Sequence, residues 1–277
     1  MGQWYITDVN SMKKFFLGIL SVLLFSTSLV SCSGDNSANP QDPGAGNYEF
    51  VDLGLSVKWA KCNIGANVPQ DFGAYFSWGE TEPKSSYTWE NYKWCEGAYN
   101  SLTKYCTDAI YGKVDNKTVL DLNDDAANFN WRDVSDLDES GKPFTYEDFV
   151  DPELVEDFGK LTKYCFKRMP TATEFEELIE NCEWVWSTVE KVKGYTIISK
   201  INGNSIFLPA AGAIEIPSIE TQGSIGYYYS SDLRTDLSTN AIHLTFYEGG
   251  RFEIQDHERR YGFTIRPVAE EKYIIKE

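Results

Sequence analysis

Polar and apolar side chains alternate on both sides of a Gly-Gly pair in the segment HLTFYEGGRFEIQ, residues 243–255. This period of two, interrupted by a glycine turn, predicts a β-hairpin. One face would carry Leu244, Phe246, Phe252 and Ile254 toward a core. The other would carry side chains of varied chemistry, namely His243, Thr245, Tyr247, Arg251, Glu253 and Gln255. This outward face combines a donor, an acceptor, a cation, an anion and an aromatic ring. Contact with solvent alone would not require such variety.

Local patterns predict further elements along the chain. Residues 171–182 predict a helix, since Thr171 and Glu174 form a capping box and apolar residues follow at helical spacing. After this helix the signals are strands and turns, among them a hairpin with Asn202-Gly203 at its tip. We therefore expect an α+β fold of mixed antiparallel sheets with one or two packed helices and long loops.

The N-terminal residues have the three regions of a secretory signal. Two lysines precede an apolar run, and small residues lead to Leu29-Val30-Ser31-Cys32, which resembles the bacterial lipobox. The apolar run is also shorter than the roughly 20 residues that a spanning helix needs. We expect a signal peptide over residues 1–31 and lipidation of Cys32, the alternative being an ordinary secretory signal with an incidental cysteine. Residues 1–11 are interpreted as an upstream start-site artefact, since a basic region normally opens a signal.

The residues after Cys32 have the composition of a flexible tether. Residues 33–47 are mostly Ser, Gly, Asn, Pro and Asp, with almost nothing to bury. Residues 32–47 would hold a globular body, residues 48–277, clear of the membrane. We therefore expect an outer-membrane lipoprotein exposed at the cell surface, which contacts the membrane only through its lipid anchor.

The charge of the chain excludes one class of partner. There are 25 Lys and Arg against 42 Asp and Glu, a formal net charge of −17 at pH 7. Such a surface repels polyanions. We therefore expect no binding to nucleic acid.

The cysteines remaining after lipidation of Cys32 are odd in number for an exported protein. Cys95 and Cys106 enclose a short loop and are the preferred disulfide pair. The chain contains no CxxC motif, so a zinc ribbon or a redox motif is not supported.

Asp121, Asn123 and Asp125 alternate as at the opening of a calcium loop. An EF-hand is excluded, because Ala126 stands where that loop needs Gly and Arg132 stands where it needs Glu. Two interpretations remain, a looser Ca²⁺ site and carboxylates that cap a turn. Apart from this ion, the sequence indicates no cofactor.

The segment 71–97 is rich in Tyr and Trp among Gly, Pro and Ser. A sugar-stacking platform and the core of a loop-rich fold both fit this composition. We favour the core, since Trp and Tyr bury large areas even where regular elements are few.

Motifs between residues 49 and 268 follow one another in an order that resembles the Fibrobacter succinogenes major paralogous domain family, abundant in lipoproteins of Bacteroidetes. They are VDLGLSVKWAKCNIGA, FGAYFSWGET, DDAANFNW, RMPTATEFEELI, GNSIFLPAAG, GYYYSSDL and YGFTIRPV. The resemblance implies a C-type-lectin-like fold related to the formylglycine-generating-enzyme group. The chain departs from the family at residues 132–167, an acidic insertion between NFNW and RMPT that we expect to project from the body.

The activities of such folds are not supported by these residues. Formylglycine generation needs cysteines in the C-terminal part, and none follows Cys182. The two histidines, His243 and His257, lack an evident nucleophile and orienting acid to complete a triad. Neither Glu-Pro-Asn nor Gln-Pro-Asp, which serve calcium-dependent sugar binding in C-type lectins, occurs. We therefore expect no enzyme.

The remaining hypothesis is binding through the C-terminal hairpin, as in lectin-fold proteins that display polar and aromatic side chains there. The proposed ligand face comprises Tyr227, Tyr228, Arg234, His243, Thr245, Tyr247, Arg251, Glu253, Gln255 and His257. Such a mixture of Tyr, Arg and polar groups is typical of binding faces, although a solvated sheet face also fits it. We expect a cell-surface lipoprotein that binds an extracellular protein or glycan. The alternatives are an assembly subunit that makes contact through residues 132–167 and an enzyme with an unrecognised site.

Overall fold

The computed structural model describes residues 48–132, 136–155, 157–215 and 219–275. The predicted signal peptide, Cys32 and the tether lie outside the described residues. Within the described ranges, no helix is long and apolar enough to cross a membrane.

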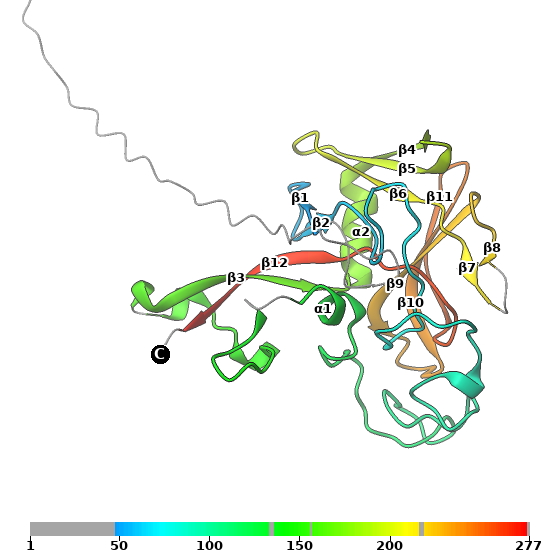
Figure 1. The fold of residues 1–277 in the computed structure, drawn as a ribbon, viewed down its shortest axis with the longest axis horizontal. Helices are drawn as coiled ribbons and strands as arrows, with labels where there is room; N and C mark the ends of the chain where they lie inside the picture. The colour runs from blue at the N-terminus through cyan, green and yellow to red at the C-terminus, as the bar shows by residue number, and fades with distance from the viewer. Residues whose placement is uncertain (1–47, 133–135, 156, 216–218, 276–277) are drawn as a thin grey trace, which may run out of the picture. The chain divides into compact units, whose positions relative to one another are not determined.

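The described residues form short helices and antiparallel strands (Figure 1). In chain order they are β1 (Phe50–Val51), β2 (Lys58–Ala60), η1 (Trp89–Asn91), α1 (Ala126–Asn130), η3 (Tyr146–Asp148), η4 (Pro152–Leu154), η5 (Phe158–Lys160), β3 (Leu161–Arg168), α2 (Ala172–Asn181), β4 (Cys182–Val189), β5 (Val192–Ser199), β6 (Ser205–Pro209), β7 (Ala213–Ile214), β8 (Ile219–Glu220), β9 (Ile225–Leu233), β10 (Asn240–Tyr247), β11 (Arg251–Glu258) and β12 (Val268–Ile275). The sheets have the strand orders β1-β2-β12-β3, β11-β10-β9, β4-β5-β6 and β7-β8. The predicted α+β class is confirmed.

Helix α2 begins and ends within a residue of the predicted bounds. The Thr171 side chain accepts from the Glu174 amide at 3.2 Å, and the Glu174 carboxylate accepts from the Thr171 amide at 2.8 Å. This is the capping box expected from the sequence. The apolar stripe of the helix joins a buried cluster that includes Phe175, Leu178, Tyr228, Leu244 and Phe246. The helix therefore covers one face of the sheet β11-β10-β9.

Both predicted hairpins form, and glycine makes their turns. Tyr247 pairs with Arg251 at the end of the β10–β11 ladder. Between them Gly249 and Gly250 have φ of 101° and 86°, a conformation that residues with a Cβ rarely adopt. The β5–β6 hairpin turns at Asn202-Gly203, where Gly203 has a φ of 77°.

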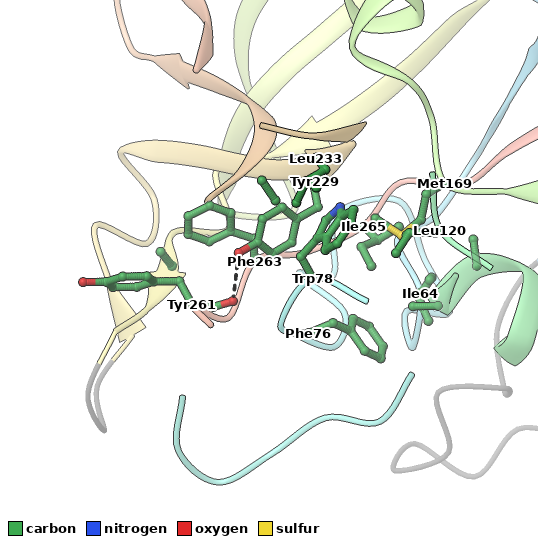
Figure 2. Packing of buried hydrophobic residues seen from close by; sticks show 14 of the residues in the cluster. Ile64, Phe76, Trp78, Leu120, Met169, Tyr229, Leu233, Tyr261, Phe263 and Ile265 are labelled. Atoms are coloured by element: carbon green, nitrogen blue, oxygen red, sulfur yellow. Dashed lines mark hydrogen bonds between the residues drawn. The ribbon is translucent and has the colours of Figure 1, made fainter. Parts of the chain in front are cut away.

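The central strand β10 is buried on both faces. On the face away from α2, the segment 259–266 between β11 and β12 covers it. The ring centroids of Phe263 and Tyr229 lie 4.6 Å apart, and the Tyr229 hydroxyl donates to the Tyr261 carbonyl at 3.1 Å. Figure 2 shows these rings in a second buried cluster, whose members include Ile64, Phe76, Trp78, Leu120, Met169, Tyr229, Leu233, Tyr261, Phe263 and Ile265.

Two fully buried arginines fasten this covering segment at its ends. Arg259 donates to the carbonyls of Lys104 and Tyr105, both at 2.9 Å. Arg266 donates to the Asn63 side chain at 2.7 Å. It also donates to three backbone carbonyls, those of Ala60, Lys61 and Phe207, at 2.8–3.0 Å. The guanidinium groups therefore join the segment to parts of the chain that are far away in sequence.

The aromatic segment 71–97 is part of the core, as the sequence favoured. Trp78, Tyr87 and Tyr92 are buried. The Trp78 indole donates to the Ser230 carbonyl at 3.0 Å, and the Tyr92 hydroxyl donates to the Trp78 carbonyl at 2.8 Å. Each ring thus buries its apolar body and hydrogen-bonds its polar atom.

The acidic insertion contributes a strand to the sheet of the body. Strand β12 pairs with β2 only at Val268 and Ala269, but it pairs with β3 up to Ile275 opposite Leu161. Figure 1 shows β3 and β12 side by side. Residues 161–167 of the predicted insertion are therefore held by the C-terminal strand, in a pairing that no local pattern indicated.

We predict that Arg266→Leu destabilises the fold by about 3 kcal/mol or more. The substitution leaves the Asn63 amide oxygen and buried carbonyls without a donor, and each such group costs about 1–3 kcal/mol. The free energy of unfolding in urea measures the effect. Arg251→Leu is the control, because the Arg251 side chain is 64% exposed and should change stability by about 0.5 kcal/mol or less. A loss below about 1 kcal/mol for Arg266→Leu would contradict the proposed role.

Candidate functional site

The candidate face is a set of cross-strand rows on the sheet β11-β10-β9. Tyr247 of β10 lies beside Arg251 of β11. Thr245 lies between Tyr227 of β9 and Glu253 of β11, and His243 lies between Tyr229 and Gln255. Side chains directly opposite one another share a face and touch. The structure therefore brings most of the predicted residues together.

His243 and Thr245 do not face solvent, so that part of the prediction is wrong. Their exposed fractions are 1% and 0%. The His243 ring lies 4.9 Å from the Phe263 ring and 6.0 Å from the Tyr227 ring, measured between centroids. The covering segment turns the polar side of β10 into an inner layer. We call His243 and Thr245 the floor of the site.

Tyr228 and Arg234 do not belong to the face. Tyr228 is fully buried toward α2, and its hydroxyl donates to the Pro209 carbonyl at 2.7 Å. Arg234 lies 2.5 Å from carboxylate oxygens of both Asp236 and Asp256. Asp256 points to the opposite face of β11 from Gln255, since successive strand residues alternate. Tyr228 is therefore a core residue, and Arg234 lies outside the candidate face.

The remaining residues are at least partly exposed, and three of them, Arg251, Glu253 and Gln255, form a hydrogen-bonded line. Glu253 accepts from Arg251 Nε at 2.6 Å through one oxygen and from the Gln255 amide through the other. The Arg251 guanidinium lies 4.8 Å from the Tyr247 ring centroid, a cation–π distance. We name this set the hairpin row; it consists of Tyr227, Tyr247, Arg251, Glu253, Gln255 and His257. Arg251, Glu253 and Gln255 therefore orient one another before any ligand binds.

Tyr261 and Glu215 border the hairpin row and were missed from the sequence. The Tyr261 ring centroid lies 4.3 Å from that of His257, and the Tyr261 hydroxyl donates to Glu215. Burial raises the pKa of Tyr261 to about 12. The alternation in YGFTIRPV could have indicated Tyr261, because it shares the parity of Phe263. Nothing local identified Glu215, which comes from the end of β7.

The histidines of the site are held in their neutral form. Burial lowers the pKa of His243 to about 3, and the neighbouring His257 lowers it further. The pKa of His257 is also lowered, chiefly by burial. The two ring nitrogens of His243 and the Thr245 hydroxyl are buried, and none of them makes a hydrogen bond with the described residues. The floor is thus polar, uncharged and without hydrogen bonds.

The residues of the proposed calcium site have other partners. Asp121 is paired with Lys104 and Lys117, at 2.5 and 2.6 Å. Asn123 accepts from Arg132 at 3.2 Å. The buried carboxylate of Asp125 caps α1 and accepts from the amides of Ala127, Asn128 and Met169. Among the described residues, no group of three His, Cys, Asp or Glu could hold a metal ion. Asp125 therefore caps a turn, as the alternative interpretation of this segment proposed.

The predicted disulfide between Cys95 and Cys106 is wrong. Both are free thiols. The Cys95 thiol donates to the Trp89 carbonyl at 3.0 Å, and the Cys106 thiol donates to the Asp108 carbonyl at 3.2 Å. Each sulfur is directed to its own local turn, which the short spacing in sequence did not reveal.

Comparison with known proteins finds no matching family model, curated protein or solved structure. The functional argument therefore depends on the residues described above.

We predict that the fold loses stability between pH 6.5 and 4.5 through His243. Its folded pKa of about 3 lies below the unfolded value of about 6.5, so the unfolded chain binds the proton more tightly. The contribution of His243 is full above pH 6.5. It is lost by about 1.4 kcal/mol per pH unit as the pH falls toward 3.

The measurement is the unfolding free energy in urea at several pH values. His243→Phe should reduce the slope by about one proton. His257→Phe is the comparison. It should also reduce the dependence of the unfolding free energy on pH, but by less, because the pKa of His257 is also lowered. Equal slopes for wild type and His243→Phe would show that the buried imidazole does not cause the acid sensitivity.

Proposed function

We propose that the chain is a cell-surface lipoprotein whose C-type-lectin-like domain binds an extracellular protein or glycan through the hairpin row. The α+β arrangement, with α2 packed on antiparallel sheets and long loops around them, suits such a domain. The lipobox at Cys32 and the motif order support the surface location and the family resemblance. No catalytic role is assigned.

The observation that carries the proposal is the preorganised line of side chains on β11. Glu253 holds Arg251 and Gln255 with its two oxygens, and Arg251 lies over Tyr247. Polar groups fixed in position lose less conformational entropy when a ligand binds. Rings of Tyr227, Tyr247 and His257 lie beside them and supply apolar contact area. This combination favours a binding surface over an ordinary solvated sheet.

A second candidate function is assembly through the insertion, and a specific observation favours it. Leu154 and Phe158 are 81% and 68% exposed. Each lies in a short 3₁₀ turn, η4 or η5, capped by an aspartate side chain. Exposed apolar side chains mark interaction sites when they form a contiguous patch, and Leu154 and Phe158 are close to each other in the sequence. The Val150 amide donates to the Tyr273 carbonyl at 2.8 Å, which ties this region to β12.

We predict that the double substitution Tyr247→Ala and Arg251→Ala weakens ligand binding at least tenfold. The change removes an aromatic surface and a fixed cation from the hairpin row, residues of the kinds that dominate binding energies. The assay is a screen of purified wild type and variant against glycans and extracellular proteins, with and without calcium.

The matched control for this screen is Tyr99→Ala with Lys113→Ala, an exposed aromatic and cation away from the hairpin. The control should bind as wild type does. If the hairpin variant and the control bind equally well, the hairpin row is not the binding surface.

We predict that Leu154→Asp with Phe158→Asp abolishes any partner contact made through the insertion while leaving binding by the hairpin row unchanged. Carboxylates at these positions cannot enter an apolar pocket without a large desolvation cost. Size-exclusion chromatography with light scattering, and crosslinking on intact cells, report assembly. Ile110→Asp with Val119→Asp, which changes similarly exposed apolar residues elsewhere, is the control. Assembly that survives the Leu154 and Phe158 changes would exclude this candidate function.

A further inference from the structure

Strand β4 is the outer strand of the sheet β4-β5-β6, and one of its edges faces away from that sheet. Val189 of β4 pairs with Val192 of β5 across a loop of two residues, both with positive φ. Such a loop closes on a hydrogen-bonded pair, so alternate residues of β4 direct their N–H and C=O groups away from β5. These residues are Trp184, Trp186 and Thr188. Within the part of the chain that the structure describes, no backbone hydrogen bond reaches them from outside their own sheet.

The sequence of β4 lacks the devices that usually protect the edge of a sheet. Edge strands are commonly short, or they carry Pro, Lys or a bulge. Strand β4 has eight residues without Pro or Lys, and its register with β5 is unbroken. Its single charged residue is Glu183, and Val185 near its middle is 39% exposed. An open strand of this kind is a template for pairing with a further strand.

The other outer strands of the described sheets differ from β4. Strands β3 and β11 each carry several charged side chains. The far edge of β9 is hydrogen-bonded, since the amides of Tyr229 and Ser231 donate to the carbonyls of Thr264 and Pro170 at 3.1 and 2.8 Å. Strand β6 has five residues and ends at Pro209, and β1, β7 and β8 have two residues each. Among the described strands, the long uncharged edge is therefore that of β4.

The charge of the sheet β4-β5-β6 permits a second copy of the same chain to approach. Two whole chains repel each other, because each has a formal net charge of −17. Residues 182–209, which span the three strands, contain two glutamates and three lysines, namely Glu183, Glu190, Lys191, Lys193 and Lys200. This part of an acidic chain is therefore nearly neutral, and two copies meet there with little local repulsion.

We propose that two copies of the chain pair antiparallel through their β4 strands, which joins their two three-stranded sheets into one continuous sheet. Trp186 lies at the two-fold axis, since it is the middle one of the three outward-facing residues and this register uses the whole strand. Trp184 then lies opposite Thr188 of the second copy, and Glu183 lies opposite Val189. No like charges face each other across this pairing, as a stable ladder requires.

Pairing through β4 holds two hairpin rows in one assembly. The Trp184 ring lies 4.6 Å from the Phe252 ring of β11, measured between centroids, and the Tyr195 hydroxyl donates to the Tyr247 carbonyl at 2.9 Å. Each sheet is thus fixed to the tip of its own hairpin. Two linked binding surfaces gain avidity on a support that displays many ligands. The pairing itself does not depend on the proposed function of the hairpin row.

The first test is sedimentation velocity of the full-length protein in detergent over a series of concentrations. We expect a monomer–dimer equilibrium. Thr188→Pro removes one outward N–H from each copy, hence two hydrogen bonds per dimer, and should weaken dimerisation about tenfold or more. Proline is tolerated where the N–H of an edge strand faces solvent, so the unfolding midpoint of the monomer should stay unchanged. Thr188→Ala, which loses the same side chain but keeps the N–H, is the matched control and should dimerise as wild type does.

The second test needs no substitution and follows amide hydrogen exchange of the wild-type protein at low and high concentration. The amides of Trp184, Trp186 and Thr188 should exchange more slowly as the concentration rises, because a partner strand then bonds them. The amides of Val185 and Ser187 face β5 and should be protected at both concentrations.

The outcomes separate this inference from the proposed function. A monomer at every concentration, or a dimer that Thr188→Pro does not weaken and in which the outward amides stay unprotected, would overturn the pairing. Protection that appears only when another protein is added would also overturn it, in favour of a foreign strand. Thr188→Pro should keep the affinity of the hairpin row for a single soluble ligand, and a Tyr247→Ala, Arg251→Ala variant should still dimerise.

Discussion

The segment between β11 and β12 depends on two guanidinium groups that are completely buried. Arg259 and Arg266 hold its two ends by donating to carbonyls of residues 60, 61, 104, 105 and 207, and to the Asn63 side chain. All of these partners are neutral oxygens. Most N–H donors of these buried cations are hydrogen-bonded, the Arg259 Nε being an exception among the described residues. A buried cation is costly unless it is hydrogen-bonded, so these contacts strongly constrain the path of the segment. The position of Phe263 over the sheet, and therefore the environment of β10, follows from them.

Coverage by this segment divides the candidate site into two layers of different chemistry. The floor, His243 and Thr245, lies in a buried environment rich in aromatic rings, in which charge is disfavoured. The hairpin row beside it lies partly in solvent, where Glu253 hydrogen-bonds to Arg251 and Gln255. An open hairpin would have exposed every polar residue equally. A covered one leaves only the fixed line of donors and acceptors at the edge of the covering segment within reach of a ligand.

The hairpin row and the insertion offer opposite kinds of contact. On the hairpin row Arg251 pairs with Glu253, and beside the row Arg260 pairs with Glu258. Near Leu154 and Phe158 the exposed apolar side chains stand among aspartates and glutamates, with few cations in the neighbouring sequence. The first surface offers fixed polar groups and aromatic rings, whereas the second offers apolar side chains surrounded by negative charge. One chain can therefore carry both without competition between them.

Local order could be predicted from the sequence alone. The capping box at Thr171 and Glu174, the apolar stripe of α2 and the glycine turns of both hairpins are encoded by residues a few positions apart, and the structure has them all. Alternation also identified which side chains share a face of the hairpin. These features depend on short-range geometry, in which helical and strand periods fix the direction of each side chain.

Only the tertiary structure decided which of those faces meets solvent. The residues that bury His243 and Thr245 come from the segment 259–266, and that segment is held by carbonyls up to about 200 positions away. The same reason explains the buried position of Trp78, whose indole donates to the Ser230 carbonyl, and the pairing of β3 with β12. Each depends on contacts between distant parts of the chain, and the periodicity of one strand contains no information about what packs on it. The sequence by itself determined the elements and the composition of the candidate face; the tertiary packing decided which of its residues remain accessible to a ligand.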